Sequence, residues 1–438
     1  MPILDLWMNG EAVGEWERDR RSIDLLRYRR EWLASPRARP ISLSLPLLPD
    51  DGEHRGDAVE AFFENLLPDS ESIRRRMRQQ FHTRSTDAFD LLREIGRDCA
   101  GAIQLLPHGD TPPDVRHIDA VPLDDAAVAD LLRGLVAAPL PGRVEENPGF
   151  RISIAGAQEK TALLRHDGRW CRPLGTTPTT HILKLPLGRV GNMRADMSTS
   201  VENEWLCGEL LRAFGLPVTR AQIGHFEDQK ALIVERFDRQ LSPDGRWWMR
   251  LPQEDLCQAF GVPPTRKYEN DGGPGIVRIL DLLRQSSQPD DRATFLRSQI
   301  AFWLLAATDG HAKNFSLHLE RDGRFRMTPL YDVLSVYPIL GRGAGALDPH
   351  DARLAMAVVG KNRHYRLGDI RRAHWNAMAR ACGFADGADA LIDELIARVP
   401  AALHAVTALL PGDFPLHVRD RVFSGIEAAA TRLANMPG

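Results

Sequence analysis

Three side chains with oxygen donors stand out in the second half of the chain: Asp309, Asn314 and Asp332. Asp309 and Asn314 lie in the polar segment 308–314, directly after an apolar run that ends at Ala307. A carboxylate can accept a proton from a hydroxyl, and carboxylate and amide oxygens can hold Mg²⁺ beside the phosphates of a nucleotide. The alternative is that the two Asp residues form helix caps or turns, which are common positions for Asp.

The interval between Asp309 and Asn314 is the D-x-x-x-x-N interval of the protein-kinase catalytic loop. In that loop the Asp is the base and the Asn binds magnesium. Asp332 follows the short predicted strand 325–328, where its carboxylate completes the metal site. His311 lies inside the same loop and is a candidate cofactor-binding residue, which either positions Asp309 or makes a structural hydrogen bond.

A loop of small residues upstream is a candidate for phosphate binding: Ala155, Gly156 and Ala157, followed by Gln158 and by Lys160-Thr161. It is not a Walker A loop, because Glu159 replaces the required Gly and Lys160 begins a predicted strand rather than a helix. Together with Asp309, the loop suits a lid over the phosphates of a nucleotide. Taken alone, it also suits a surface turn.

Lys184 lies among Ile182, Leu183 and Leu185 on a predicted strand, which is a costly place for an ammonium group without an anion. We expect nucleotide phosphate as that anion, with Glu202 or Glu204 holding the lysine as in kinases. The alternative is a lysine that extends to solvent from an edge strand. The segment Glu235-Arg236-Phe237 follows another apolar strand and is expected to offer its backbone to adenine.

These residues are positioned by a sheet-rich part followed by a helical part. The turn 166–169 joins predicted strands 160–164 and 170–173 in a hairpin, and 181–185 and 231–234 add two more strands. Apolar spacing of the helical type predicts helices around 57–66, 87–95 and 205–214, and later at 254–260, 276–283, 292–307, 391–410 and 418–433. The glycine run 272–275 is expected to be a turn ahead of a helix.

We therefore expect an α+β protein-kinase-like fold with two lobes. Its parts are an N-terminal α+β subdomain (1–106), a connecting region (107–149), a β-rich ATP-binding lobe (150–237) and a helical catalytic lobe (238–438). The polar, Pro-rich stretch 107–122 supports a boundary there.

Composition restricts the class of protein. Of 438 residues, 43% are hydrophobic and 26% charged, which excludes disordered and collagen-like chains. The net charge of -3 leaves nucleic-acid binding to local patches, such as Lys361, Arg363, Arg366, Arg371 and Arg372. Such a cluster is usually a solvated face. Five scattered cysteines, a start without the pattern of a secretory signal and apolar runs too short to span a bilayer favour a cytoplasmic protein without membrane contact.

The sequence resembles the HipA family of serine/threonine protein kinase toxins of bacterial toxin-antitoxin modules. The resemblance covers nearly the whole chain, through blocks such as FFENLLPDS, RISIAGAQEKTALL, TPTTHILKLP, RLPQEDLCQAFG, YENDGGPGI and TDGHAKNFS. It implies ATP and Mg²⁺ as cofactors, Asp309 as the base, Asn314 and Asp332 as metal ligands, Lys184 at the ATP phosphates and Lys160 in the phosphate loop.

The resemblance further implies autophosphorylation at Ser153, glutamyl-tRNA synthetase as the protein substrate, and a HipB-like DNA-binding antitoxin as the partner. Phosphate on Ser153 would repel the nucleotide or displace the loop, so we expect it to switch activity off. The chain departs from general protein kinases, because Thr308 precedes Asp309, no Gly follows Asp332 at the kinase spacing and no G-x-G-x-x-G lid is present. The alternatives are a catalytically idle corepressor scaffold and a small-molecule phosphotransferase.

Overall fold

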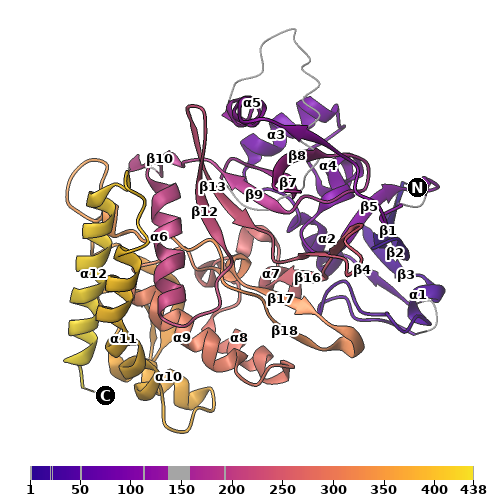
Figure 1. Ribbon diagram of the computed structural model, residues 1–438. Coiled ribbons are helices and arrows are strands. Elements are labelled where there is room, and N and C mark those ends of the chain that lie inside the picture. The colour runs from indigo at the N-terminus through magenta and orange to yellow at the C-terminus, as the bar shows by residue number, and fades with distance from the viewer. Residues whose placement is uncertain are drawn as a thin grey trace. The chain divides into compact units, whose positions relative to one another are not determined.

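The computed structural model describes residues 2–19, 21, 23–49, 52–111, 114–136, 158–191 and 194–437. These residues fall into two compact units, each assembled from separate stretches of chain (Figure 1). The first contains Met1–Leu185, Gly224–Arg266 and Ser316–Phe325. The second contains Pro186–Ile223, Lys267–Phe315 and Arg326–Gly438.

The first 106 residues form an antiparallel sheet with helices packed on it. Within the described residues its strand order is β4-β3-β2-β1-β5. The strands are β1 (Ile3–Met8), β2 (Glu11–Arg18), β3 (Asp24–Tyr28), β4 (Glu53–Arg55) and β5 (Ile103–Pro107), and the helices are α1 (Arg30–Leu33), α2 (Asp57–Glu64), α3 (Glu71–Phe81) and α4 (Ala88–Ile95). Trp16 stacks on Phe63 at the centre of their core, with ring centroids 3.7 Å apart. The expected α+β character of this region is confirmed.

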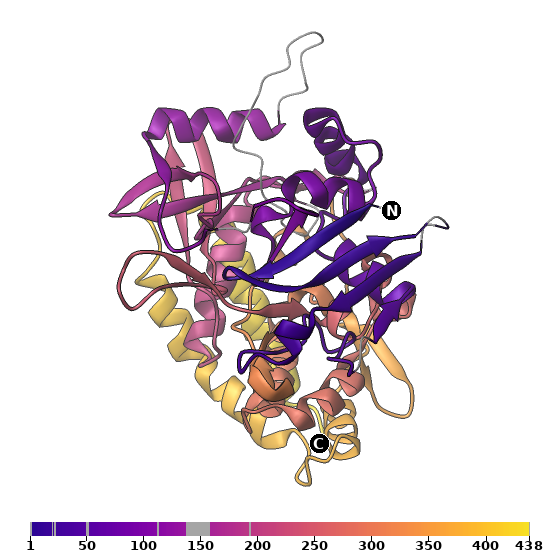
Figure 2. The same ribbon diagram turned by 90° about the vertical axis from the view of Figure 1, so that its right-hand side faces the viewer.

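A second sheet in the same unit has the order β12-β13-β9-β7-β8-β6 within the described residues. Its strands are β6 (Ala120–Leu123), β7 (Lys160–His166), β8 (Arg169–Pro173), β9 (His181–Lys184), β12 (Ala221–Phe226) and β13 (Gln229–Glu235). The β7-β8 hairpin is as predicted, since Asp167 and Gly168 take the positive φ angles, 49° and 74°, of the turn that suits twisted strands. Helix α5 (Asp125–Val136) contacts β6, β7 and β13 (Figure 2).

Two short sheets complete the first unit. They contain β14 (Arg239–Leu241) with β15 (Trp248–Arg250), and β16 (Gln253–Asp255) with β17 (Ser316–Leu319) and β18 (Phe325–Met327). The helix predicted for 254–260 is shorter than expected. Glu254 pairs with Leu317 in β16, and Asp255 caps the N-terminus of the four-residue helix α7 (Leu256–Ala259) through a capping box with Gln258.

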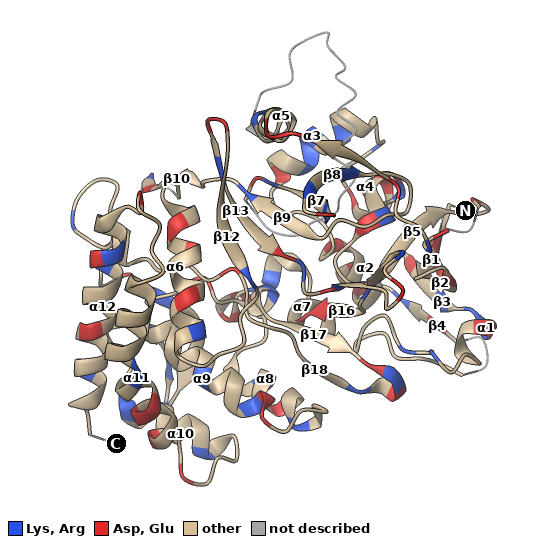
Figure 3. Cartoon of the chain, in the orientation of Figure 1, with Lys and Arg blue, Asp and Glu red and all other residues tan. Residues whose placement is uncertain are grey.

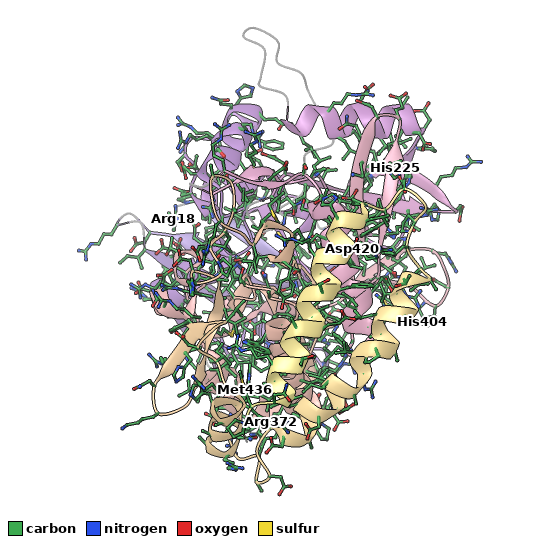
Figure 4. The ribbon with its side chains drawn as sticks, turned by 90° about the vertical axis from the view of Figure 1, so that its left-hand side faces the viewer. Arg18, His225, Arg372, His404, Asp420 and Met436 are labelled. Atoms are coloured by element: carbon green, nitrogen blue, oxygen red, sulfur yellow. The ribbon has the colours of Figure 1, made fainter. Side chains whose placement is uncertain are left out.

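The second unit is mainly helical. Its helices are α6 (Ser200–Ala213), α8 (Ile276–Leu282), α9 (Asp291–Leu304), α10 (Arg372–Ala381), α11 (Asp389–Thr407) and α12 (Leu416–Ala434), and its strands are β10 (Gly188–Val190), β11 (Ala195–Met197), β19 (Arg353–Val359) and β20 (Arg363–Arg366). Helices α11 and α12 lie side by side, and His404 and Asp420 are on their exposed sides (Figure 4). Buried residues such as Val406 and Val422 lie on the opposite faces, as the predicted helical spacing requires.

Two sequence-based expectations need refinement. The region 107–149 is more than a connection, because it contributes β6 to the sheet and α5 to its face. The helix predicted to reach Ala307 ends at Leu304, since Ala306 has a φ of 48° and its carbonyl accepts a hydrogen bond from the Val336 amide. Lys, Arg, Asp and Glu are interspersed along the elements (Figure 3). None of the described helices combines the length and apolar character needed to cross a membrane.

Candidate active site

Asp309, Asn314 and Asp332 come together in the second unit. The Asn314 Nδ2 group donates to the backbone carbonyl of Asp309 at 2.8 Å and to that of Asp332 at 3.4 Å. Both amide hydrogens are thereby used on the backbone of the two acidic residues, which leaves the Asn314 Oδ1 atom as an oxygen donor for a cation. The Asn314 side chain therefore links the backbone at Asp309 to the backbone at Asp332 by hydrogen bonds.

The loop that carries Asp309 is fixed by its own backbone. The His311 amide donates to the Asp309 carbonyl at 2.8 Å, and the Asn314 amide donates to the His311 carbonyl at 2.9 Å. A Cβ atom at Gly310 would lie 2.6 Å from the Phe302 ring, so only glycine fits against α9 there. His311 and Asn314 are buried whereas Asp309 is exposed, so the Asp309 carboxylate is accessible from solvent.

Asp332 has strained backbone geometry, with a φ of 59°. Such left-handed residues cluster at functional sites, and Asp tolerates this conformation better than most residues. The neighbouring Tyr331 hydroxyl donates to the Lys313 carbonyl at 2.8 Å and so joins the two loops. Further along, the buried Asn203 side chain of α6 exchanges two hydrogen bonds with the Ser335 backbone, at 2.7 and 3.0 Å.

The predicted phosphate-binding lysines lie in the first unit. Lys160 on β7 and Lys184 on β9 are directly opposite each other across two antiparallel strands, and Lys184 is buried. Opposed side chains share one face of a sheet, so the two lysine side chains lie on the same face.

The rest of the predicted phosphate loop is described only at its end. Ser153, Ala155, Gly156 and Ala157 lie outside the described residues. The Gln158 side chain donates to the Leu185 carbonyl, and the Leu185 amide donates to the Glu159 carbonyl at 3.1 Å. The end of the loop is therefore fixed to the end of β9, beside Lys184. Lys160 begins strand β7 rather than a helix, as the sequence predicts.

The predicted adenine-binding segment has mixed properties. Glu235 ends β13 and is exposed, and the Phe237 ring meets His318 edge to face at 5.7 Å. Arg236 is different, because its amide donates to the Thr180 carbonyl at 2.9 Å and its buried guanidinium contacts Asp238 and Thr179. Since both groups are already used, the expectation that Arg236 contacts the cofactor is not supported, and we assign it a structural role.

The expected pairing of Lys184 with Glu202 or Glu204 joins residues of different units and remains a prediction. All three side chains are buried. A further contact was not foreseen from the sequence: the Tyr268 hydroxyl donates to Asp309 Oδ1 at 2.5 Å. Tyr268 lies in the block YENDGGPGI, whose glycines predict a turn but give no indication of a contact with Asp309.

A second group of potential metal ligands lies in the N-terminal sheet region. Asp5, Glu15 and His108 bring ligand atoms within 4.8 Å of one another. The Arg29 guanidinium donates to Asp5 at 2.9 Å and to Glu15 at 3.1 Å, so it offsets part of their negative charge.

An α+β chain that brings Asp309, Asn314 and Asp332 together in one unit and opposes two lysines on a sheet has the residue types that a protein-kinase-like phosphotransferase uses. Comparison with known proteins identifies its family. Residues 4–106 match the model of the HipA N-terminal domain, and residues 152–403 match that of the HipA-like C-terminal domain. The chain belongs to the HipA family.

Relatives along most of the chain agree. Y4mE of Sinorhizobium fredii, whose name gives kinase activity as provisional, is 34% identical over 388 residues, which cover 87% of this chain and 86% of that protein. The serine/threonine-protein kinase toxin HipA of Shewanella oneidensis is 27% identical over 377 residues, 81% of this chain and 78% of that protein. A solved complex of HipA, HipB and operator DNA from Shewanella oneidensis MR-1 matches 98% of this chain and 97% of its own, with a TM-score of 0.78 and 24% identity. The expected α+β kinase-like fold of this family is thus confirmed.

Proposed function

We propose that this chain is an ATP- and Mg²⁺-dependent serine/threonine protein kinase that acts as the toxin of a type II toxin-antitoxin module. The observation that carries the proposal is the junction at Asn314, whose amide joins the backbones of Asp309 and Asp332. This junction supports one base and two oxygen ligands acting in a single site.

Each residue has one task in this reaction. Asp309 accepts the proton of the substrate hydroxyl. The hydroxyl oxygen bonds to the γ-phosphorus of ATP, and the bond between the γ-phosphorus and the β-phosphate oxygen breaks. Asn314 Oδ1 and the Asp332 carboxylate fit the hard oxygen donors that Mg²⁺ prefers, and they would hold it. When bound, Mg²⁺ would neutralise negative charge on the phosphates.

The first unit supplies nucleotide binding. Lys184 and Lys160 face each other across β9 and β7, and we assign both to the ATP phosphates together with Ala155, Gly156, Ala157 and Gln158 of the loop. The backbone of Glu235 and Phe237 is assigned to adenine. His311 shapes the catalytic loop through its backbone, so we assign it to positioning the base rather than to contact with ATP.

The biological role rests on the relatives. We propose glutamyl-tRNA synthetase as the substrate, whose phosphorylation inhibits translation, and Ser153 as an autophosphorylation position that switches activity off. A HipB-like antitoxin would neutralise the toxin and bring it to operator DNA for corepression. The toxin role accords with the name of the Shewanella oneidensis kinase toxin, and the antitoxin partner and operator DNA accord with the complex of HipA, HipB and operator DNA.

The test is phosphoryl transfer to a purified protein. The chain is incubated with γ-labelled ATP, Mg²⁺ and glutamyl-tRNA synthetase, with and without tRNA, and Asp309→Asn serves as the inactive control. We expect label on a serine or threonine of the synthetase with the unmodified chain. Label on the kinase alone would reject the substrate, label on a small molecule would favour the phosphotransferase alternative, and the absence of any label would favour the corepressor scaffold.

A further inference from the structure

Asp309 is held by a side chain from a separate loop. The Tyr268 hydroxyl donates to Asp309 Oδ1 at 2.5 Å, within the second unit. Asp309 is exposed, so packing alone does not fix the orientation of its carboxylate. A base must present a defined oxygen to the substrate hydroxyl, and a hydrogen bond to the other oxygen supplies that orientation.

The segment around Tyr268 is itself rigid. The Tyr268 carbonyl accepts from the amides of Asp271 and Gly273, at 3.1 and 2.9 Å. The Lys267 carbonyl accepts from the Ala312 amide at 3.3 Å, which ties the segment to the catalytic loop. The Tyr268 ring packs edge to face on His311, with ring centroids 5.0 Å apart.

The next residues lock the segment from the other side. Glu269 Oε2 accepts from the Ala357 amide at 2.6 Å, and a Cβ atom at Gly275 would overlap the Glu269 carboxylate. Gly272 has a φ of 97°, which favours glycine. The glycines of this block therefore form the turn that places the Tyr268 hydroxyl beside Asp309. They do not form a second phosphate loop.

We infer that Tyr268 is a positioning residue for the base, an inference that rests on the proposed kinase function. Tyr268 holds Asp309 Oδ1 and leaves Oδ2 to accept the proton of the acceptor hydroxyl, while the tyrosine keeps its own proton. The competing interpretation is that the Tyr268 hydroxyl occupies the place of the substrate hydroxyl and must leave before catalysis. The fixed backbone of 267–275 favours a residue that stays in place.

The test compares Tyr268→Phe with the unmodified chain in initial-rate labelling of the protein by γ-labelled ATP and Mg²⁺. The phenyl ring can still pack on His311, so the fold is retained and thermal unfolding should confirm this. We expect kcat to fall about ten- to one-hundredfold, the usual range for a hydrogen bond to a charged group, with KM for ATP unchanged.

A double-mutant cycle separates positioning from a structural effect. If Tyr268 acts through Asp309, Tyr268→Phe should cost no further rate in an Asp309→Asn background. Tyr337→Phe is the matched control, since it removes a hydroxyl that donates to the Leu304 carbonyl at 3.0 Å. It should lower the melting temperature and leave the rate unchanged.

Each result decides the inference. An unchanged or faster rate in Tyr268→Phe, or full additivity with Asp309→Asn, would overturn it while the kinase function stands. A faster rate would identify Tyr268 as a placeholder for the substrate hydroxyl. If the unmodified chain incorporates no label, the proposed function fails, and the assignment of Tyr268 fails with it.

Discussion

Asp332 combines a charge suited to Mg²⁺ with a left-handed backbone, and the two properties can be separated by mutation. Asn tolerates the left-handed region as Asp does, so Asp332→Asn removes the charge without adding strain. We expect a normal melting temperature and an Mg²⁺ concentration for half-maximal labelling at least about tenfold higher. Asp322→Asn is the matched control, because Asp322 has a φ of 60° and is exposed. An equal Mg²⁺ requirement in both variants would argue against Asp332 as a ligand.

Glu254 gives a prediction about pH. This residue is buried on β16 and accepts a hydrogen bond from the Leu43 amide at 2.8 Å, and burial raises its pKa from 4.5 to about 8. A carboxyl whose folded pKa is raised binds its proton more tightly in the folded state, so its contribution to stability is present below about pH 4.5 and is lost as pH rises to about 8.

Glu254→Gln mimics the protonated form and should remove this loss. We expect the variant to be about 1 to 4 kcal/mol more stable than the unmodified chain at pH 8 and similar to it at pH 4.5, by urea unfolding. Glu71→Gln, at an exposed position of α3, is the control. If the free energies of unfolding of the unmodified chain and of Glu254→Gln changed with pH in parallel, Glu254 would titrate normally.

At the scale of elements, a buried ion network connects the first 106 residues to the strands that follow. Asp98, after α4, lies 3.4 Å from Arg236, 2.9 Å from Arg239 and 3.5 Å from Arg250, and accepts from the Thr179 hydroxyl at 2.7 Å. Burial alone would raise the pKa of Asp98, but the guanidinium groups outweigh burial and hold the pKa well below its usual range. The N-terminal region is thus part of the structure that fixes the segment 235–239.

Asp98→Asn should therefore be severely destabilising. Among the described residues it leaves Arg236 and Arg239 with Asp238 as their carboxylate partner and Arg250 with none. Removing one member of a buried ion pair costs about 3 to 5 kcal/mol. Chemical denaturation measures the effect, and Asp110→Asn, at an exposed site 3.8 Å from Arg97, is the control. A loss below about 1 kcal/mol would mean that the network is dispensable.

The sequence predicted most elements because their signals are local. The helical spacing of α9 and α12, the Asp-Gly turn of β7-β8 and the D-x-x-x-x-N interval all act over a few residues. Contacts between distant residues left no local pattern. Asn203 with Ser335, Asp98 with Arg239, and Tyr268 with Asp309 are each separated by more than 40 positions, and β16 was misread because its partner strand β17 lies far along the chain.

At the scale of the whole molecule, the basic cluster after β19 is a candidate for contact with DNA in a complex with the antitoxin. Arg372 is already paired within the protein, with Asp393 at 2.8 Å and with Asp389. Arg363 lies 3.6 Å from Glu269. Lys361, Arg366 and Arg371 are exposed and remain the candidate contacts.

Charge reversal tests this contact. In the presence of a HipB-like antitoxin, replacing Lys361, Arg366 and Arg371 with Glu should weaken retention of operator DNA and reduce the salt dependence of binding by about one unit per lost phosphate contact. Arg75→Glu, at an exposed position of α3, is the control. Unchanged binding with an unchanged salt dependence would assign all DNA contact to the antitoxin.

In the proposed kinase, Asp309, Asn314 and Asp332 form one phosphotransfer site. The most direct measurement is the rate at which the purified chain and its Asp309→Asn variant transfer label from γ-labelled ATP to protein, with and without Mg²⁺. We expect transfer that requires Mg²⁺ and falls about 100- to 10,000-fold in the variant, the usual contribution of a general base. Equal rates in the two proteins, or no transfer by either, would contradict the claim.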